Sequence, residues 1–353
     1  MTVKAGFDPT TRDLHLGHAV LLKKLRSYQD AGHHVVMVVG DFTAKVGDPT
    51  GRNQARPVLS DKDIEENAKT YMEQAFKILD PEKTTVRKNS EWFGQMSAAD
   101  LLSLAQRFTV QQLLKRNDFE KRMTDETPLG LHEVLYPLLQ GYDSVALAAD
   151  IEVGGDDQLF NLHMGRDMQR HFGKKMQEVT TVPLLVGVDG VKKMSKSLGN
   201  HIGLLDTPTD IFGKTMSIPD ETIGKWSETL GCLIKSSEPY EQKKELAFSL
   251  VAWLTDKQKA RAALDEWNER FARRVFETSE TKDIEKGQNV AQILVSIGFC
   301  KSMTEAKQNI QSGAVRLNGE KITNYQDIIE SGVLSLGRRK LANIRVLSKK
   351  LSP

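Results

Sequence analysis

The chain has 353 residues, of which 39% are hydrophobic and 27% are charged, and its formal net charge is +2. This length exceeds one ordinary hydrophobic core and favours two or three domains, with a composition typical of globular proteins. The two cysteines, Cys232 and Cys300, lack the spacing of a disulfide framework or a zinc site and fit a reducing, cytoplasmic compartment. The sequence has no signal peptide and no apolar run of about 18 residues, so neither export nor membrane insertion is expected.

Strands and helices alternate through the first part of the chain. Residues 35–39 form an uninterrupted apolar run, typical of a strand buried on both faces, and an apolar stripe before Gly32 indicates a helix. In chain order, the pattern predicts a strand at residues 3–7, a helix at 13–31, a strand at 35–39, a glycine-rich loop at 40–51 and a helix at 61–79. This spacing indicates a parallel α/β sheet.

The later segments divide the chain. In chain order, we expect a helical pattern over 91–140, strands at 151–153 and 182–186, helices from Thr207 to about Glu277, a polar linker at 279–288, and a small α+β module with a helix at 304–312 and a hairpin at 315–322. The predicted domains are therefore a sheet domain at 1–204 with a helical insertion at about 91–130, a helical domain at 205–285, and a small module at 286–353.

Charge is divided unevenly along the chain. Residues 290–353 contain ten Lys and Arg against four Asp and Glu, a net charge of +6, which leaves −4 for the rest. A basic module on a slightly acidic body indicates a polyanionic partner at the C-terminal end. A solvated charged face is the alternative explanation.

A first motif, with His15, Gly17 and His18, lies where the first helix is expected to begin. Free N–H groups at a helix N-terminus attract phosphate, and imidazole nitrogens can donate to phosphate or ribose oxygens. Gly17 would let a nucleotide approach the backbone closely. The alternatives are a helix start without a role, or a metal-binding His pair, which lacks a third ligand.

A second motif, Lys193–Ser197, follows an expected strand. Its two lysines lie three residues apart on a loop and can reach a diphosphate, where their charge helps most in a transition state. An exposed basic loop would have the same composition. The GxxxxGK[ST] pattern of a Walker A loop does not occur there.

Further polar residues lie at turns and on one expected helix. Gly155 and Asp157 follow a strand, where a carboxylate can take ribose hydroxyls. Asp48 lies in a turn of a kind that, taken alone, is more often only a turn. In the helical pattern of 131–149, three polar residues at i, i+4 and i+7 share one face: Tyr136, Gln140 and Asp143. Core packing with these side chains turned outward is the alternative.

Together, these motifs resemble those of the bacterial tyrosyl-tRNA synthetases, which are class I aminoacyl-tRNA synthetases. Residues 6–10 and 14–18 resemble the first signature of that family, Lys193–Ser197 the second, and residues 308–315 part of its S4-type RNA-binding domain. The resemblance spans nearly the whole chain. It implies a Rossmann-like parallel-sheet catalytic domain, a helical anticodon-side domain and a small α+β S4-like domain.

The resemblance also implies a two-step reaction. L-tyrosine and ATP, with Mg²⁺ on the triphosphate, form tyrosyl-adenylate, and the tyrosyl group then passes to the 3′-terminal adenosine of tRNA(Tyr). A cytoplasmic homodimer that pairs through the helical insertion is implied as well. A tryptophanyl-tRNA synthetase, and a non-catalytic RNA-binding protein that retains the fold, are the alternatives.

Site residues follow from the resemblance position by position. The implied tyrosine-binding residues are Asp8, Asp48, Tyr136, Gln140, Asp143 and Gln158. The implied ATP-binding residues are His15, Gly17, His18, Gly155, Asp157, Lys193, Met194 and Lys196. The implied catalytic residues are Thr10, His15, His18, Arg52, Arg56, Lys193 and Lys196, with no metal ligand among them.

Two positions depart from the family pattern. Some members carry a tyrosine as a second phenol ligand where this chain has Lys4, which leaves Asp143 as the main discriminator of tyrosine. Members also usually have a helical segment before the first strand. Because Met1 nearly begins that strand, a shortened N-terminus is expected.

Overall fold

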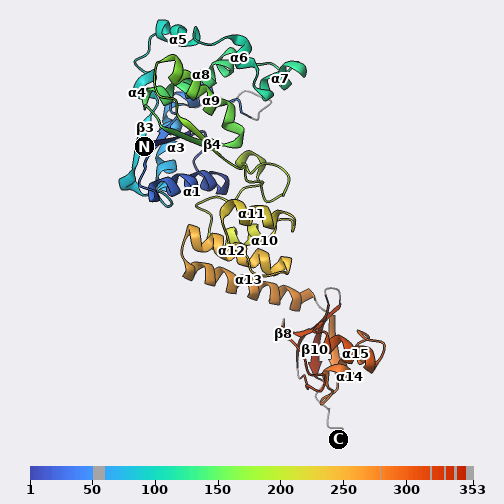
Figure 1. Ribbon diagram of the computed structural model, residues 1–353. Coiled ribbons are helices and arrows are strands. Elements are labelled where there is room, and N and C mark those ends of the chain that lie inside the picture. The colour runs from blue at the N-terminus through green and yellow to red at the C-terminus, as the bar shows by residue number, and fades with distance from the viewer. Residues whose placement is uncertain (51–59, 279, 319, 330, 338–339, 347–353) are drawn as a thin grey trace. The chain divides into compact units, whose positions relative to one another are not determined.

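The computed structural model describes residues 1–50, 60–278, 280–318, 320–329, 331–337 and 340–346. The chain forms two compact units, Met1–Ala260 and Arg261–Pro353, coloured blue to orange and orange to red in Figure 1. The first unit contains both the sheet and the helices up to residue 260. The division into three domains therefore stays a prediction.

Five parallel strands form the sheet of the first unit, in the order β3-β2-β1-β4-β5. The strands are β1 (Thr2–Phe7), β2 (His34–Val39), β3 (Thr84–Lys88), β4 (Ile151–Gly155) and β5 (Glu178–Val182). In β2, residues 35–39 are all buried, as expected for a central strand. The sheet grows outward on both sides of β1, so a ligand crevice is expected at the carboxyl ends of β1 and β4.

The two edge strands correct the sequence prediction. β3 was not expected, and β5 begins at Glu178, so the strand expected at 182–186 is wrong beyond Val182. Both strands pair on one side only and are only partly buried, so neither requires a continuous apolar run. The apolar residues 183–185 face a cavity instead.

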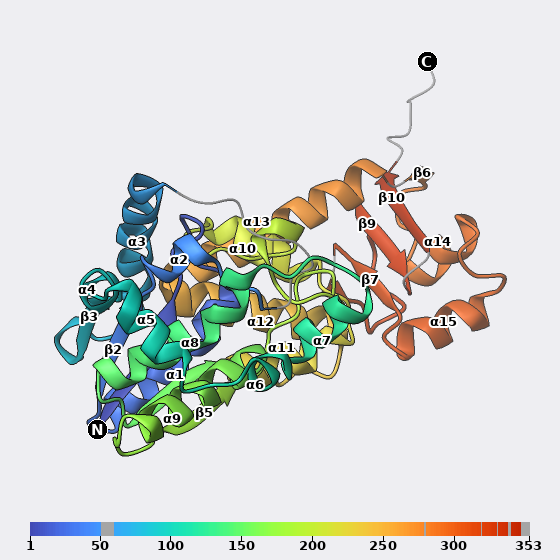
Figure 2. The same cartoon turned by 90° about the horizontal axis from the view of Figure 1, so that it is seen from above.

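Helices pack on this sheet largely as the periodicity predicts. α1 (Leu16–Asp30) contacts β2 and β4 through buried side chains such as Leu22 and Leu25, and α9 (Leu159–His171) contacts β4 and β5. α8 (Leu131–Ala146) lies along α9 (Figures 1 and 2). Two element bounds differ from the prediction. α3 (Asp61–Ala75) ends four residues before the expected end at residue 79, and the glycine-rich loop contains a short helix, α2 (Thr43–Val46), that was not expected.

The expected helical insertion is present between β3 and α8. It consists of α4 (Ser90–Phe93), α5 (Ala98–Ala105), α6 (Val110–Leu114) and α7 (Asn117–Thr124). α7 is fixed to the start of α8 by a buried ion pair, in which Arg122 Nη1 lies 2.8 Å from Glu133 Oε1. Large apolar side chains of the insertion are exposed, including Leu102 of α5, at 65%, and Val110 of α6, at 63%.

Helices follow from residue 207, as expected. They are α10 (Pro208–Met216), α11 (Thr222–Leu230), α12 (Pro239–Leu254) and α13 (Lys257–Thr278). The Thr207 side chain caps α10, with Pro208 in its first turn. Trp226 of α11 is completely buried, and its indole N–H donates to the Val186 carbonyl. Among the described residues, no helix is long and apolar enough to cross a membrane.

The second unit is a small α+β module. Its strands are β6 (Glu280–Ile284), β7 (Val315–Leu317), β8 (Glu320–Lys321), β9 (Ser331–Leu336) and β10 (Lys340–Val346), in the order β6-β10-β9-β7-β8. The expected hairpin is formed by β7 and β8, but β6 occupies what was expected to be a linker. α14 (Val290–Ser296) and α15 (Met303–Gln311) complete a core that includes Ile293, Ile310 and Ile344.

Candidate active site

A cavity of about 840 Å³ opens at the carboxyl ends of β1 and β4. It is lined by every predicted site residue that the structure describes: Asp8, Thr10, His15, Gly17, His18, Asp48, Tyr136, Gln140, Asp143, Gly155, Asp157, Gln158, Lys193, Met194 and Lys196. Arg52 and Arg56 lie outside the described residues. Folding therefore brings the two motifs and the polar face of α8 together, while the role of each residue stays a prediction.

The first motif forms the N-terminus of α1. His15 is the N-cap, with its Nδ1 accepting from the Gly17 N–H at 3.1 Å, and His18 Nδ1 accepts from the His15 N–H at 3.2 Å. Burial lowers the pKa of His18 to about 4, and burial, followed by the neighbouring His18, lowers that of His15 further. Both rings are therefore neutral at pH 7, with the proton on Nε2 as a donor.

Gly17 has a local reason to be glycine. A Cβ atom added there would lie 2.9 Å from Cε1 of the His15 ring, which is too close for a real contact. The residue thus allows the capping imidazole to fold against the backbone. The group packed against Gly17 is therefore the His15 ring, whereas the sequence motif predicts a nucleotide there.

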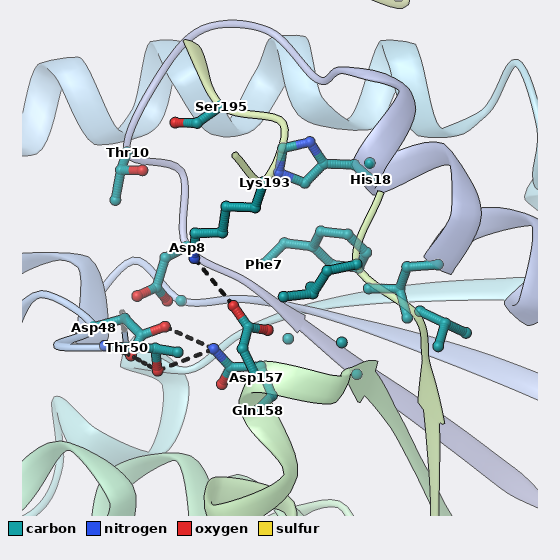
Figure 3. A pocket seen from close by; sticks show the side chains of 18 of the residues that line it. Phe7, Asp8, Thr10, His18, Asp48, Thr50, Asp157, Gln158, Lys193 and Ser195 are labelled. Atoms are coloured by element: carbon teal, nitrogen blue, oxygen red, sulfur yellow. Dashed lines mark hydrogen bonds and ion pairs between the residues drawn. The ribbon is translucent and has the colours of Figure 1, made fainter. Parts of the chain in front are cut away.

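Both lysines of the second motif meet carboxylates around the cavity. Lys193 Nζ lies 3.2 Å from Asp157 Oδ2, a pair drawn in Figure 3, and Lys196 Nζ lies 3.6 Å from Asp13 Oδ2. Lys196 also donates to Thr11 Oγ1 at 3.3 Å and to the Asp13 carbonyl. Burial lowers the pKa of Lys196. The motif loop therefore presents two cations, each paired with a carboxylate.

The polar face of α8 points into the cavity, so the outward-turned alternative is wrong. The Tyr136 hydroxyl donates to Asp8 Oδ2 at 2.8 Å, and Gln140 Nε2 donates to Glu152 Oε1 at 3.3 Å. Asp143 is 4% exposed, and burial raises its pKa to about 7. This carboxyl can thus exchange its proton near neutral pH.

Asp48 joins two other polar side chains at the cavity. Its Oδ2 accepts from Gln158 Nε2 at 2.9 Å, and its Oδ1 accepts from the Thr50 hydroxyl at 2.6 Å and the Thr50 N–H at 2.9 Å. Figure 3 shows Asp48 and Thr50, from one loop, meeting Gln158 from another segment of the chain. Asp48 therefore belongs to an ordered cluster, and the turn has more than a connecting role.

Lys4 lies behind this site. It is 1% exposed and is the register partner of Glu152 on the adjacent strand β4, with Lys4 Nζ 3.2 Å from Glu152 Oε1. The same ammonium group donates to the Gln140 carbonyl at 3.2 Å. Lys4 is thus held within the sheet, and it is not among the described residues that line the cavity.

Sequence reasoning missed several neighbours of the site. Trp92 of α4 donates its indole N–H to Asp143 Oδ1 at 2.9 Å, and Glu152 and Thr50 both line the cavity. Thr50 could have been found from its place in the glycine-rich turn. Trp92 and Glu152 carry no local signal, because their contacts depend on how the insertion and β4 meet α8.

Comparisons with known proteins agree with this geometry. The family model described as tRNA synthetases class I (W and Y) matches residues 1–283, and a model of the S4 domain matches residues 289–334. The chain belongs to this synthetase family. The sequence resemblance and the expected Rossmann-like fold with a small S4 module are therefore confirmed.

Individual relatives are consistent with the family assignment. A tyrosine–tRNA ligase of Aquifex aeolicus is 47% identical, covering 99% of this chain and 92% of its own length, and one of Haemophilus influenzae is 45% identical, covering 98% and 90%. A solved tyrosyl-tRNA synthetase from Archaeoglobus fulgidus, complexed with L-tyrosine, is 23% identical and covers 74% of this chain and 90% of its own, with a TM-score of 0.61. This last similarity shows the fold alone.

Proposed function

We propose that this chain is a tyrosine–tRNA ligase, which forms tyrosyl-adenylate from L-tyrosine and ATP and transfers the tyrosyl group to the 3′-terminal adenosine of tRNA(Tyr). One observation carries the proposal: a buried carboxyl on α8, Asp143, and the two motif lysines, Lys193 and Lys196, line the same cavity. Relatives that match nearly the full chain are tyrosine–tRNA ligases. A tryptophanyl enzyme is less supported by these relatives.

Tyrosine would bind along α8. Asp143 would accept a hydrogen bond from the phenol hydroxyl, while Asp48, Tyr136 and Gln140 would hold the α-ammonium group and Gln158 would lie near the carboxylate. Phenylalanine would leave the buried Asp143 without its hydroxyl partner. Trp92 would still donate to Asp143 Oδ1, but a buried carboxyl that loses one of its donors is costly, which is a physical basis for rejecting phenylalanine.

ATP would bind between α1 and the second motif. The Nε2–H groups of His15 and His18 lie at a helix N-terminus, which favours phosphate and ribose oxygens. Asp157 would accept from the ribose hydroxyls, beside Gly155. Lys193 and Asp157 form an ion pair with each other. ATP would replace this pair, with its ribose hydroxyls bound to the Asp157 carboxylate and its phosphates bound to the Lys193 ammonium group.

The remaining predicted contacts concern the phosphates. We place Thr10 and Lys196 there, together with Arg52 and Arg56 from outside the described residues, while Met194 would contact ATP without a phosphate role. Among the described residues, no group of three His, Cys, Asp or Glu side chains is arranged to hold a metal ion. As the family resemblance implies, Mg²⁺ would accompany the triphosphate of ATP, where it would neutralise charge.

The first chemical step needs orientation and positive charge rather than a base. The tyrosine carboxylate is already ionised at neutral pH, so its oxygen can attack the α-phosphorus directly. The new carboxyl–phosphorus bond forms as the bond to the β-phosphate oxygen breaks, and pyrophosphate leaves with its charge met by the lysines. In the second step, a ribose hydroxyl of tRNA takes the tyrosyl group and AMP leaves.

Tyrosine-dependent ATP–pyrophosphate exchange tests this proposal on the purified chain. Exchange with tyrosine, and not with phenylalanine or tryptophan, is the expected result, because Asp143 selects a phenol hydroxyl. Exchange with tryptophan would identify the tryptophanyl enzyme instead. A folded chain that binds tRNA and supports no exchange would favour the non-catalytic RNA-binding protein.

A further inference from the structure

We propose that Arg116, in the helical insertion, is a positioning residue that fixes Asp48 and Gln158 in the orientation that receives the ammonium and carboxylate groups of tyrosine. This inference rests on the proposed function and adds a residue that the sequence motifs do not include. Arg116 occupies the N-cap position of α7 and is only 5% exposed. A cation so deeply buried needs several partners.

Arg116 reaches in two directions. On one side its Nε and Nη2 donate to the two carboxylate oxygens of Asp118 at 2.7 and 2.9 Å, a bidentate pair that fixes the plane of the guanidinium. On the other side Nη2 donates to Thr50 Oγ1 at 2.7 Å and Nη1 donates to Asn161 Oδ1 at 3.2 Å. The guanidinium therefore joins the insertion to two segments beside the cavity.

These contacts belong to a closed hydrogen-bond circuit of Arg116, Thr50, Asp48, Gln158 and Asn161. Thr50 Oγ1 receives hydrogen bonds from Arg116 and from Gln158 Nε2, the second at 3.1 Å, and gives its own proton to Asp48 Oδ1. Asn161 Nδ2 donates to Gln158 Oε1 at 2.9 Å, and Gln158 Nε2 donates to Asp48 Oδ2. Each member is thus held by at least two others.

The directions of the hydrogen bonds in the circuit are set from two ends, by Arg116, which can only donate, and by the Asp48 carboxylate, which can only accept. Because a guanidinium can only donate, Asn161 must turn its oxygen towards Arg116 and its amide nitrogen towards Gln158. Gln158 must then turn its own nitrogen towards Asp48, and the Thr50 hydroxyl must point its proton at the same carboxylate. Without Arg116, the Asn161 amide could flip, and Thr50 and Gln158 would be oriented by Asp48 alone.

Charge adds to this geometry. Arg116 Nη2 lies 3.9 Å from Asp48 Oδ1, so the guanidinium stabilises the carboxylate while no ligand ammonium is bound. Asp48 therefore does not have to reorganise when tyrosine enters. Preorganised partners of this kind increase affinity because less ordering is left for the binding step.

The test compares Arg116→Gln with a matched control, Arg122→Gln. Arg122 is a second buried arginine of the insertion, and its hydrogen bonds among the described residues go to Glu133 and to the Pro128 carbonyl rather than to the circuit. In ATP–pyrophosphate exchange, we expect Arg116→Gln to raise KM for tyrosine about tenfold, the size of one well-ordered charge-assisted contact, with KM for ATP nearly unchanged. Arg122→Gln should leave both KM values close to those of the parent chain.

A binding measurement separates positioning from a general loss of structure. The parent chain should bind tyrosine more tightly than 3-(4-hydroxyphenyl)propionate, which lacks the ammonium group, and Arg116→Gln should reduce this preference. A merely structural role would weaken both ligands equally. If Arg116→Gln does not fold, Thr50→Val opens the circuit while leaving the Arg116–Asp118 pair intact, and it should give the same selective loss.

Two outcomes would overturn the inference. One is an unchanged KM for tyrosine in Arg116→Gln and Thr50→Val, and the other is an equal effect of Arg122→Gln. The proposed function is judged separately, because it fails only if the parent chain itself shows no tyrosine-dependent exchange.

Discussion

At the scale of single residues, the carboxyl groups of the cavity differ in their surroundings. Asp48 lies in the hydrogen-bond circuit, whereas Asp143 is buried on α8 and has a pKa of about 7. Burial is the main cause of this raised pKa, opposed by Lys4 and the Trp92 hydrogen bond and reinforced by the negative charges of Glu152 and Asp8. The carboxyl that we propose to recognise the phenol thus has a pKa in the range where the enzyme would work.

Discrimination between tyrosine and phenylalanine should therefore depend on pH. Above pH 7 Asp143 is a carboxylate that accepts strongly from the phenol hydroxyl, and below pH 7 it becomes protonated and a weaker acceptor. The ratio of kcat/KM for the two amino acids should rise about tenfold from pH 6 to pH 8, following the ionised fraction. Asp143→Asn should flatten this profile, and a parent profile that is already flat would contradict the prediction.

The buried pair of Lys4 and Glu152 should stabilise the sheet only as a pair. Lys4→Met leaves the Glu152 carboxylate buried without its cation and should lower the free energy of unfolding by about 3–5 kcal/mol. Combining Lys4→Met with Glu152→Gln removes both charges and should recover most of the loss. Urea unfolding, monitored by the fluorescence of the buried Trp226, measures the free energy of unfolding of both variants.

A surface pair provides the control for this prediction. Arg26 and Asp30 are an exposed i,i+4 ion pair on α1, with Arg26 Nε 2.8 Å from Asp30 Oδ1. Arg26→Ala should cost less than about 1 kcal/mol, because solvent screens the pair. If Lys4→Met lowered the free energy of unfolding by a similarly small amount, the buried pair would matter no more to stability than the exposed one.

Lys196 should act on the chemical step more than on amino-acid binding. Lys196→Ala removes the cation that we propose meets the departing pyrophosphate, and it should slow adenylate formation on the order of a hundredfold, with tyrosine affinity nearly unchanged. Single-turnover adenylate formation and equilibrium tyrosine binding measure the two effects. Lys192→Ala, at an exposed neighbouring position, is the control, and equal losses of rate and affinity would count against the assigned role.

At the scale of elements, the insertion has an exposed apolar surface. Leu102 of α5 and Val110 of α6 are both more than half exposed. Consistent with the family resemblance, we propose that these exposed apolar side chains lie in the interface of a homodimer. The hydrogen-bond circuit would then link that interface to the amino-acid site through Arg116.

Light scattering at micromolar concentration should show a dimer, and Leu102→Glu combined with Val110→Glu should shift it to a monomer. A buried charge at a subunit interface is strongly unfavourable. Leu233→Glu is the matched control, since Leu233 is 86% exposed and lies outside the insertion. A monomeric parent chain would rule out this assignment.

At the scale of the whole molecule, the second unit is a separate basic module with its own hydrophobic core. If it binds tRNA, affinity should depend strongly on salt, because Lys and Arg displace counterions from phosphates. We expect Kd for tRNA to rise at least tenfold between about 50 and 200 mM salt, while KM for tyrosine in the exchange reaction changes little. A salt-insensitive Kd for tRNA would contradict a phosphate-based contact.

Local sequence by itself determined the family, the helices with clear periodicity and the central strands. The capping of α1, the apolar run of β2 and the two lysines of the second motif are all encoded within a few neighbouring residues. The same is true of the polar face of α8, because residues at i, i+4 and i+7 share a helix face regardless of the remaining fold. These features need no long-range information.

Only the tertiary structure decided the edge strands and the partners of the site. β3 and β5 are paired on one side and partly buried, so their residues lack the continuous apolar run that marks β2. The Gln140 and Glu152 partners of Lys4 lie more than a hundred residues away in the chain, and the Thr50 and Asn161 partners of Arg116 lie tens of residues away. A buried charge is acceptable only where folding brings such partners to it, so its role cannot be inferred from its immediate neighbours.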